Sequence, residues 1–69
     1  MDLKELETRF TYHAPKEGQP EKYGVIRGTA RSLAMVIGDN CPESREKSLA
    51  FTKLEEAVMW ANAAIARRG

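Results

Sequence analysis

Apolar residues recur at helical spacing along three segments of the chain, and the first segment is the shortest. Its apolar positions, separated by three and four residues, are Leu3, Leu6 and Phe10. Asp2 precedes them as a candidate N-cap, and Glu5 follows three residues later in a box-like pattern. This pattern predicts a short helix over residues 2–9. Two helical turns are marginally stable in isolation, so we expect this helix to dock on another element.

The second segment has one clear apolar helical face, which predicts a helix over residues 20–38. Its members are Tyr23, Ile26, Ala30, Leu33, Ala34 and Ile37. Pro20 suits the first turn of this helix because the missing N–H has no partner there. Gly38 or Asn40 is predicted to end it in the left-handed conformation.

The third segment is the longest, and Pro42 suits the first position of a helix predicted over residues 42–67. About four residues then separate the two long helices, which is short enough to force an antiparallel pair. One apolar stripe consists of Phe51, Leu54, Val58, Ala61 and Ile65, and a second of Ala50, Ala57, Trp60 and Ala64. Together they are wider than one partner helix can cover, so the pattern predicts a subunit interface.

The predicted fold is therefore all-α, a short N-terminal helix followed by a two-helix antiparallel hairpin in one domain over residues 1–69. A chain of 69 residues is in the size range where a single core supplies only a few kcal/mol. Its single cysteine, Cys41, excludes an intrachain disulfide, and its single histidine, His13, leaves no spaced set of metal ligands. We therefore expect assembly into a compact homo-oligomer.

Charge and composition narrow the functional classes. The chain has 11 Lys and Arg against 10 Asp and Glu, which argues against DNA binding because that needs a broad positive excess. No apolar run approaches the roughly 20 residues of a membrane span, and the first ten residues do not resemble a signal peptide. We expect a soluble, cytosolic protein.

The pattern of reactive residues does not favour catalysis. Cys41 and His13 lie in different segments, and the adjacent Glu55 and Glu56 point about 100° apart on a helix and are expected to be solvated. The sequence contains neither a glycine-rich phosphate loop nor a nucleophile elbow. We expect no enzymatic activity, no cofactor and no metal.

Cationic and aromatic residues favour binding of an anionic, planar ligand. They are Arg9, Tyr12, His13 and Lys16 in the first loop, Arg27, Thr29 and Arg31 on the second helix, and Arg67 and Arg68 at the end of the third. Arginine matches phosphate with a planar fork, and tyrosine offers a face for base stacking. Arg27 and Arg31 share one helical face, with Thr29 expected within a hydroxyl's reach. Surface arginines also serve solubility and favour helix C-termini, so this alternative stays open.

Three segments carry a family resemblance: RFTYHAPKEGQPEKY, IRGTARSLAMVI and CPESREKSLAFTKLEEAVMWANAAIAR. They resemble phage anti-CBASS type 2 proteins, the cyclic-nucleotide sponges of a hairpin-domain family shared with a Thoeris anti-defence protein. The resemblance covers nearly the whole chain. It implies a homo-oligomer, typically a hexamer, in the cytoplasm of the infected bacterial host. Such proteins are not enzymes; they sequester cyclic oligonucleotide second messengers, including 3',3'-cGAMP and other cyclic dinucleotides, at subunit interfaces.

The resemblance also assigns roles to individual positions. It implies that Tyr12 stacks on a base and that Arg27 pairs with a phosphate where the family has lysine, a change from a point charge to a bidentate fork. A separate pocket for cyclic trinucleotides would use Thr29 and a C-terminal arginine, Arg67 or the neighbouring Arg68.

Two alternatives from other functional classes stay open. The wide apolar face of the third helix also suits a helical protein-interaction module that has no nucleotide ligand. A DNA-binding regulator of helix-turn-helix type is disfavoured by the near-neutral charge and by the presence of only two long helices.

Overall fold

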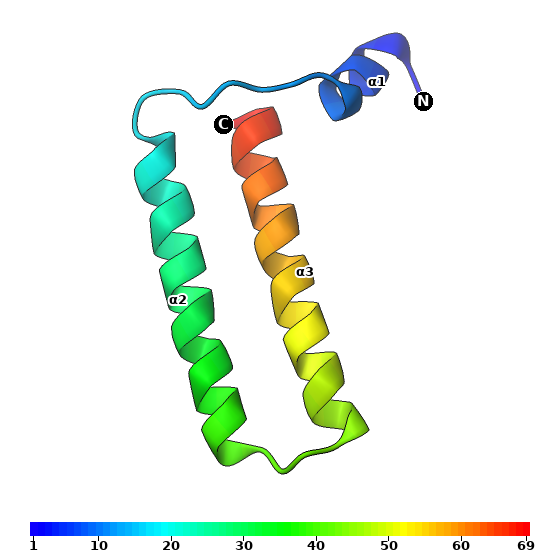
Figure 1. Cartoon of the computed structure of the whole chain (residues 1–69). Coiled ribbons are helices and arrows are strands. Elements are labelled where there is room, and N and C mark those ends of the chain that lie inside the picture. The colour runs from blue at the N-terminus through cyan, green and yellow to red at the C-terminus, as the bar shows by residue number, and fades with distance from the viewer.

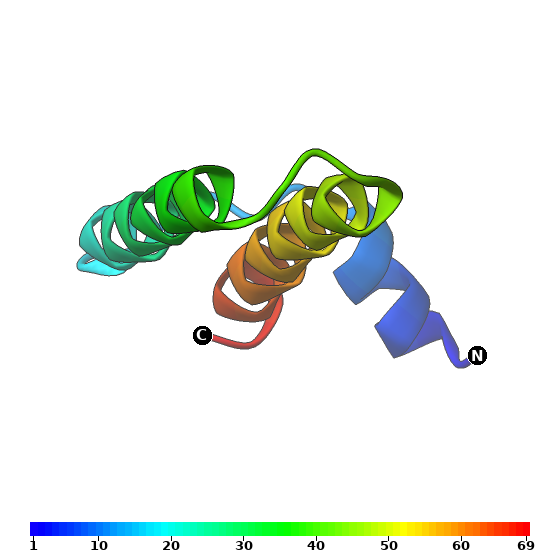
Figure 2. The same cartoon turned by 90° about the horizontal axis from the view of Figure 1, so that it is seen from below.

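The computed structural model describes residues 1–69 as three helices and no strand: α1 (Leu3–Phe10), α2 (Gln19–Asn40) and α3 (Arg45–Arg68). α2 and α3 form an antiparallel hairpin, and α1 lies beyond α3 (Figure 1). Seen along the hairpin, the three helices form a single layer (Figure 2), with overall dimensions of 45 × 29 × 12 Å. The all-helical class and the hairpin predicted from the sequence are confirmed.

The hairpin is joined along one apolar seam, made mostly of the residues that the helical periodicity predicts. The half-buried side chains are Tyr23, Ile26, Ala30, Ala34 and Ile37 on α2 and Ala50, Leu54, Val58, Ala61 and Ile65 on α3. No apolar residue is buried, and Leu33 and Trp60 are 47% and 64% exposed. The accessible surface is 5664 Å², whereas a folded monomer of this mass has about 4,300 Å². The seam therefore covers only part of the apolar surface.

The first loop, residues 11–18, crosses the C-terminal end of α3 before α2 begins (Figure 1). Gln19 fastens this crossing and is the only buried residue, at 5% exposure. Its Nε2 donates to the carbonyl of Ile65 at 3.1 Å, and its Oε1 accepts from the main-chain N–H of Lys16 at 2.9 Å. The turn into α2 places Gly18 at φ 82°, a left-handed conformation that glycine adopts without steric cost.

The C-terminus of α2 differs from the prediction. The helix continues through Asn40 and ends at Cys41 in an extended conformation, so neither Gly38 nor Asn40 takes the predicted left-handed cap. The last carbonyls are satisfied in other ways. The carbonyl of Ile37 accepts from the Cys41 N–H at 3.0 Å, and the carbonyl of Val36 accepts from the Asn40 Nδ2 at 2.8 Å. The carbonyl of Gly38 accepts from the Lys47 ammonium at 3.1 Å. These bonds make a left-handed turn unnecessary.

The start of α3 also differs from the prediction, because Pro42 lies in the connection and not in the first helical turn. Ser44 is the N-cap, and its Oγ accepts from the Lys47 N–H at 3.1 Å. The serine oxygen gives an otherwise unpaired helical N–H a hydrogen-bond partner. Proline has no N–H of its own and its side chain offers no such acceptor, so the serine determines where the helix begins. The connection still has four residues, Cys41 to Ser44.

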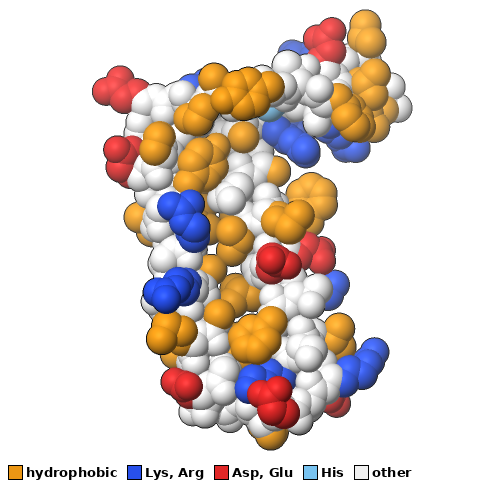
Figure 3. Space-filling view, viewed as in Figure 1, with side chains coloured by type: hydrophobic (Ala, Val, Ile, Leu, Met, Phe, Trp, Pro, Cys, Tyr) orange, Lys and Arg blue, Asp and Glu red, His pale blue; other side chains and the backbone are white.

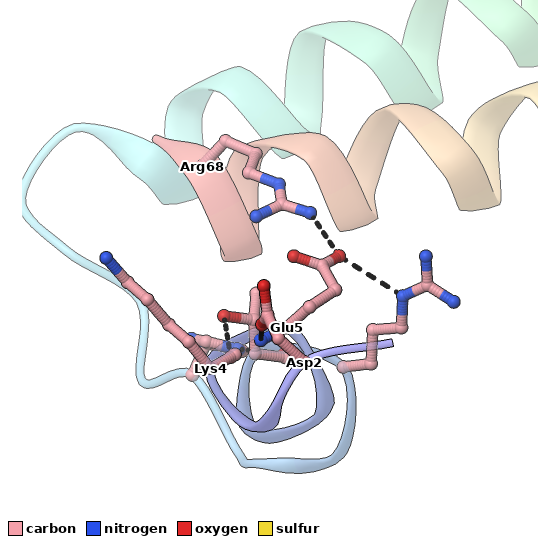
Figure 4. Close-up of polar contacts among 7 residues, drawn as sticks. Asp2, Lys4, Glu5 and Arg68 are labelled. Carbon is pink, nitrogen blue, oxygen red and sulfur yellow. Dashed lines mark hydrogen bonds and ion pairs between the residues drawn. The ribbon is translucent and has the colours of Figure 1, made fainter.

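An ion-pair cluster ties α1 to the end of α3. Asp2 caps α1 as predicted, with its Oδ1 accepting from the Glu5 N–H at 2.8 Å. The Glu5 side chain does not complete a capping box; its Oε1 accepts from Arg68 at 2.7 Å and from Arg9 at 3.2 Å (Figure 4). Hydrogen bonds from Arg68 and then Arg9 lower the pKa of Glu5, and the bond to Glu5 raises the pKa of Arg68.

We expect acid to release α1 from α3. Because the folded-state pKa of Glu5 lies below its ordinary value of 4.5, its contribution is complete above that value and is lost as pH falls through the folded-state pKa. Trp60, the only tryptophan, lines the same groove as Phe10 of α1, so its fluorescence should report the release. At neutral pH, Glu5→Gln should already have the Trp60 fluorescence that the wild type reaches only in acid. Added salt should weaken the wild-type contact, because the ion pair is exposed to solvent.

The matched control is Glu7→Gln, which removes an exposed acid of α1 that makes no ion pair. Its fluorescence titration should follow that of the wild type. If Glu5→Gln and Glu7→Gln titrate alike, Glu5 does not hold α1.

Candidate functional site

Two neighbouring hollows lie along one face of the hairpin. The loop hollow, of about 410 Å³, is lined by Arg9, Thr11, Tyr12, His13, Tyr23, Asn62, Ala63, Ala66 and Arg67. The hairpin hollow, of about 270 Å³, is lined by Arg27, Ala30, Arg31, Ala34, Phe51, Leu54, Glu55, Val58 and Met59. Tyr23 and Arg27 are four residues apart on α2 and so project from the same side of the helix. Figure 3 shows basic side chains on α2 beside the apolar seam.

The loop hollow brings together four of the predicted site residues, Arg9, Tyr12, His13 and Arg67. Tyr12 follows α1 directly and is 82% exposed, so its ring is available for stacking. The Nε2 of His13 lies 2.7 Å from the carbonyl of Thr8. Since a carbonyl can only accept, this nitrogen carries the proton, and His13 serves to fix the loop against the last turn of α1.

The structure separates the two C-terminal arginines, which the sequence left as alternatives. Arg68 is held by Glu5. Arg67 makes no ion pair and lines both the loop hollow and a groove between α1 and α3. That groove, of about 460 Å³, is lined by Glu5, Arg9, Phe10, Trp60, Ala63, Ala64, Arg67 and Arg68. Of the two, Arg67 is the arginine whose guanidinium is unpaired beside the loop hollow.

Arg27 and Arg31 line one hollow, as their spacing predicts, but the predicted placement of Thr29 beside them is wrong. Thr29 lines an apolar groove of about 380 Å³ on the other side of the hairpin. We call it the rear groove, and its other members are Val25, Ile26, Ala30, Leu33, Leu54, Ala57, Val58 and Ala61. Two residues along a helix turn the side chain by about 200°, which carries Thr29 away from Arg27.

The residues paired by the family resemblance do not share a hollow within one chain. Tyr12 lines the loop hollow, whereas Arg27 lines the hairpin hollow. Thr29 lines the rear groove, and Arg67 lines the loop hollow and the α1–α3 groove. A ligand that contacts either pair must extend across two hollows of one chain or bind between two chains.

Sequence reasoning assigned no ligand-binding role to four polar residues of these hollows: Thr11, Tyr23, Glu55 and Asn62. The Oδ1 of Asn62 is shielded from solvent and accepts no hydrogen bond. Asn62 lies four residues after Val58 and three before Ile65, so it is a polar residue on the seam side of α3. That interruption of the apolar pattern was the available signal.

Two further observations limit the kinds of site that the chain presents. No His, Cys, Asp and Glu side chains gather in a group of three that could hold a metal ion. None of the three helices has both the length and the apolar character needed to cross a bilayer.

Comparison with known proteins identifies one family. A family model described as Acb2/Tad1, hairpin domain, matches residues 2–66. No match was found among curated proteins or among solved structures. The matched segment includes all of α1 and α2 and nearly all of α3. The chain therefore belongs to the Acb2/Tad1 hairpin-domain family, in agreement with the resemblance of its sequence.

Proposed function

We propose that this protein is a phage immune-evasion sponge, which binds cyclic oligonucleotide second messengers and withholds them from CBASS effectors without cleaving them. One observation carries the proposal. In a chain of the Acb2/Tad1 hairpin family, the exposed ring of Tyr12 and the unpaired guanidinium of Arg27 line successive hollows on one face. The ligands we propose are cyclic dinucleotides such as 3',3'-cGAMP, and the site of action is the cytoplasm of the infected bacterium.

The chemistry of the two hollows suits such a ligand. A cyclic dinucleotide has flat bases for an aromatic ring and phosphates for arginine forks. Because Tyr12 and Arg27 do not share a hollow, we place the ligand between subunits or across both hollows of one chain. Enclosure by a second subunit would shield the charge-assisted bonds from water and strengthen them.

A pocket for cyclic trinucleotides is a separate part of the proposal. Thr29 and Arg67 belong to different hollows, so a pocket containing both would take them from different chains.

The rear groove supports homo-oligomerisation, and we propose a hexamer. Eight of the nine residues that line it are apolar, the exception being Thr29, and Leu33 and Val25 are 47% and 68% exposed. A second copy of the chain could cover this surface and supply the core that one chain does not have.

We expect tight binding of 3',3'-cGAMP in isothermal titration calorimetry, weakened by either Tyr12→Ala or Arg27→Ala. Loss of base stacking or of a charge-assisted contact costs about 1–3 kcal/mol each, or roughly 5- to 150-fold in affinity. The matched control is Arg45→Ala, an exposed arginine at the start of α3, which should bind normally. Unchanged affinity in both test variants would remove Tyr12 and Arg27 from the site.

The absence of cleavage is tested on the same complex by heating it and analysing the released nucleotide. A sponge returns the nucleotide intact, whereas an altered nucleotide indicates a catalytic site. If neither cyclic dinucleotides nor cyclic trinucleotides bind, the apolar faces favour a protein-interaction module instead.

We expect sedimentation equilibrium to give a mass of six chains of 7.7 kDa. Leu33→Glu should dissociate the oligomer, because it places a carboxylate in the rear groove. Arg45→Glu, which changes charge at an exposed position outside that groove, should leave the mass unchanged. A wild-type monomer would contradict the proposed assembly.

A further inference from the structure

The hairpin hollow combines charges of opposite sign around an apolar floor. Arg27 and Arg31 project from α2, and Glu55 projects from α3. The floor between them consists of Ala30, Ala34, Leu54 and Val58, and Phe51 and Met59 flank it. The hollow therefore presents donors on the α2 side, a carboxylate on the α3 side and apolar surface between the two.

None of these three charged side chains is paired. The ion pairs of the chain join Glu5 to Arg9 and Arg68, Glu43 to Lys47, and Glu56 to Lys53. No nitrogen of Arg27 or Arg31 comes within 4.0 Å of a Glu55 oxygen, although all three line one hollow of about 270 Å³. By contrast, the adjacent Glu56 pairs with Lys53 at 3.6 Å. The hollow keeps its opposite charges apart and available to a ligand.

The chemistry of these groups specifies the ligand that would fit between them. Guanidinium groups only donate hydrogen bonds, and an ionised carboxylate only accepts them. A complementary molecule needs anionic oxygens on the arginine side, N–H donors on the glutamate side and a flat apolar body over the floor. A nucleotide whose base carries two adjacent N–H donors meets all three requirements.

Guanine is the base that has this donor pattern. Its Watson–Crick edge presents N1–H beside the N2 amino group, which matches the two oxygens of one carboxylate. Adenine presents one amino group beside an unprotonated ring nitrogen, whose lone pair would face and repel the second oxygen. A phosphate of the same ligand suits the guanidinium forks of Arg27 and Arg31.

We infer that Glu55 is a specificity-determining residue that reads a guanine base in the hairpin hollow, and that Arg31 joins Arg27 in holding the phosphates. This inference rests on the proposed function and extends it by naming the preferred base and two additional ligand contacts. The side chains of Phe51 and Met59, 37% and 64% exposed, are placed to cover the face of that base.

The test compares 3',3'-cyclic di-GMP with 3',3'-cyclic di-AMP by calorimetry on the full chain. The wild type should bind the guanine ligand more tightly. Glu55→Gln replaces one acceptor oxygen with a donor at nearly constant shape, so it should weaken cyclic di-GMP binding about tenfold or more. Binding of cyclic di-AMP should stay the same or tighten, since a negative charge near the phosphates is removed.

Two further variants separate base reading from general electrostatics. Glu56→Gln removes the same charge one residue along, but about 100° around the helix, and should leave the ratio of the two affinities unchanged. Arg31→Gln should weaken both ligands alike and reduce the dependence of binding on salt, because one phosphate contact is lost.

The outcomes distinguish this inference from the proposed function. If both ligands bind but Glu55→Gln leaves their affinity ratio unchanged, or if the wild type prefers cyclic di-AMP, the guanine assignment is overturned and the sponge function stands. If neither ligand binds the wild type, the assignment falls together with the dinucleotide site on which it rests.

Discussion

A two-helix hairpin can bury only the seam between its helices, and this constraint governs the rest of the molecule. The seam of this chain is rich in alanine, and no apolar side chain is buried. Burial of apolar surface is the main favourable term in folding, so a chain with 5664 Å² of accessible surface has little packing energy with which to fix its parts. Its loops and its first helix are held instead by a few polar contacts at the ends of the hairpin.

Two of these contacts join α2 to α3, one at each end of the hairpin. At the open end, Gln19 of α2 donates to the main chain of α3 at Ile65. At the turn, Lys47 of α3 donates to the main chain of α2 at Gly38, and its side chain is only 10% exposed. Small alanine side chains tolerate sliding along a seam, whereas a directed hydrogen bond does not. Gln19 and Lys47 therefore set the register that places the residues of the hairpin hollow opposite one another.

The helices and their seam could be predicted because both depend on local periodicity. The four-residue spacing of Ile26 and Ala30 on one helix, and of Leu54 and Val58 on the other, is part of that pattern. The helix ends were less predictable, because Ser44 and Pro42 compete and only the observed cap geometry decides between them. Which residues line the same hollow depends on contacts between parts of the chain that are far apart in the sequence. Nothing in the local sequence indicates that Glu5 binds Arg68, 63 residues away. Thr29 was misplaced for a simpler reason, since two residues along a helix lie on nearly opposite sides.

The lack of a core also links the proposed assembly to the proposed ligand. A second copy on the rear groove would supply the packing that one chain lacks, and it would fix the hairpin whose opposite face carries Arg27, Arg31 and Glu55. Ala30, Leu54 and Val58 belong to both the rear groove and the hairpin hollow, so any shift at the seam changes both surfaces together. A ligand that binds only the assembled, folded state stabilises that state by mass action. Reciprocity then requires assembly to tighten ligand binding by the same factor. For a protein proposed to act by retention and not by catalysis, this coupling would favour slow release of the nucleotide.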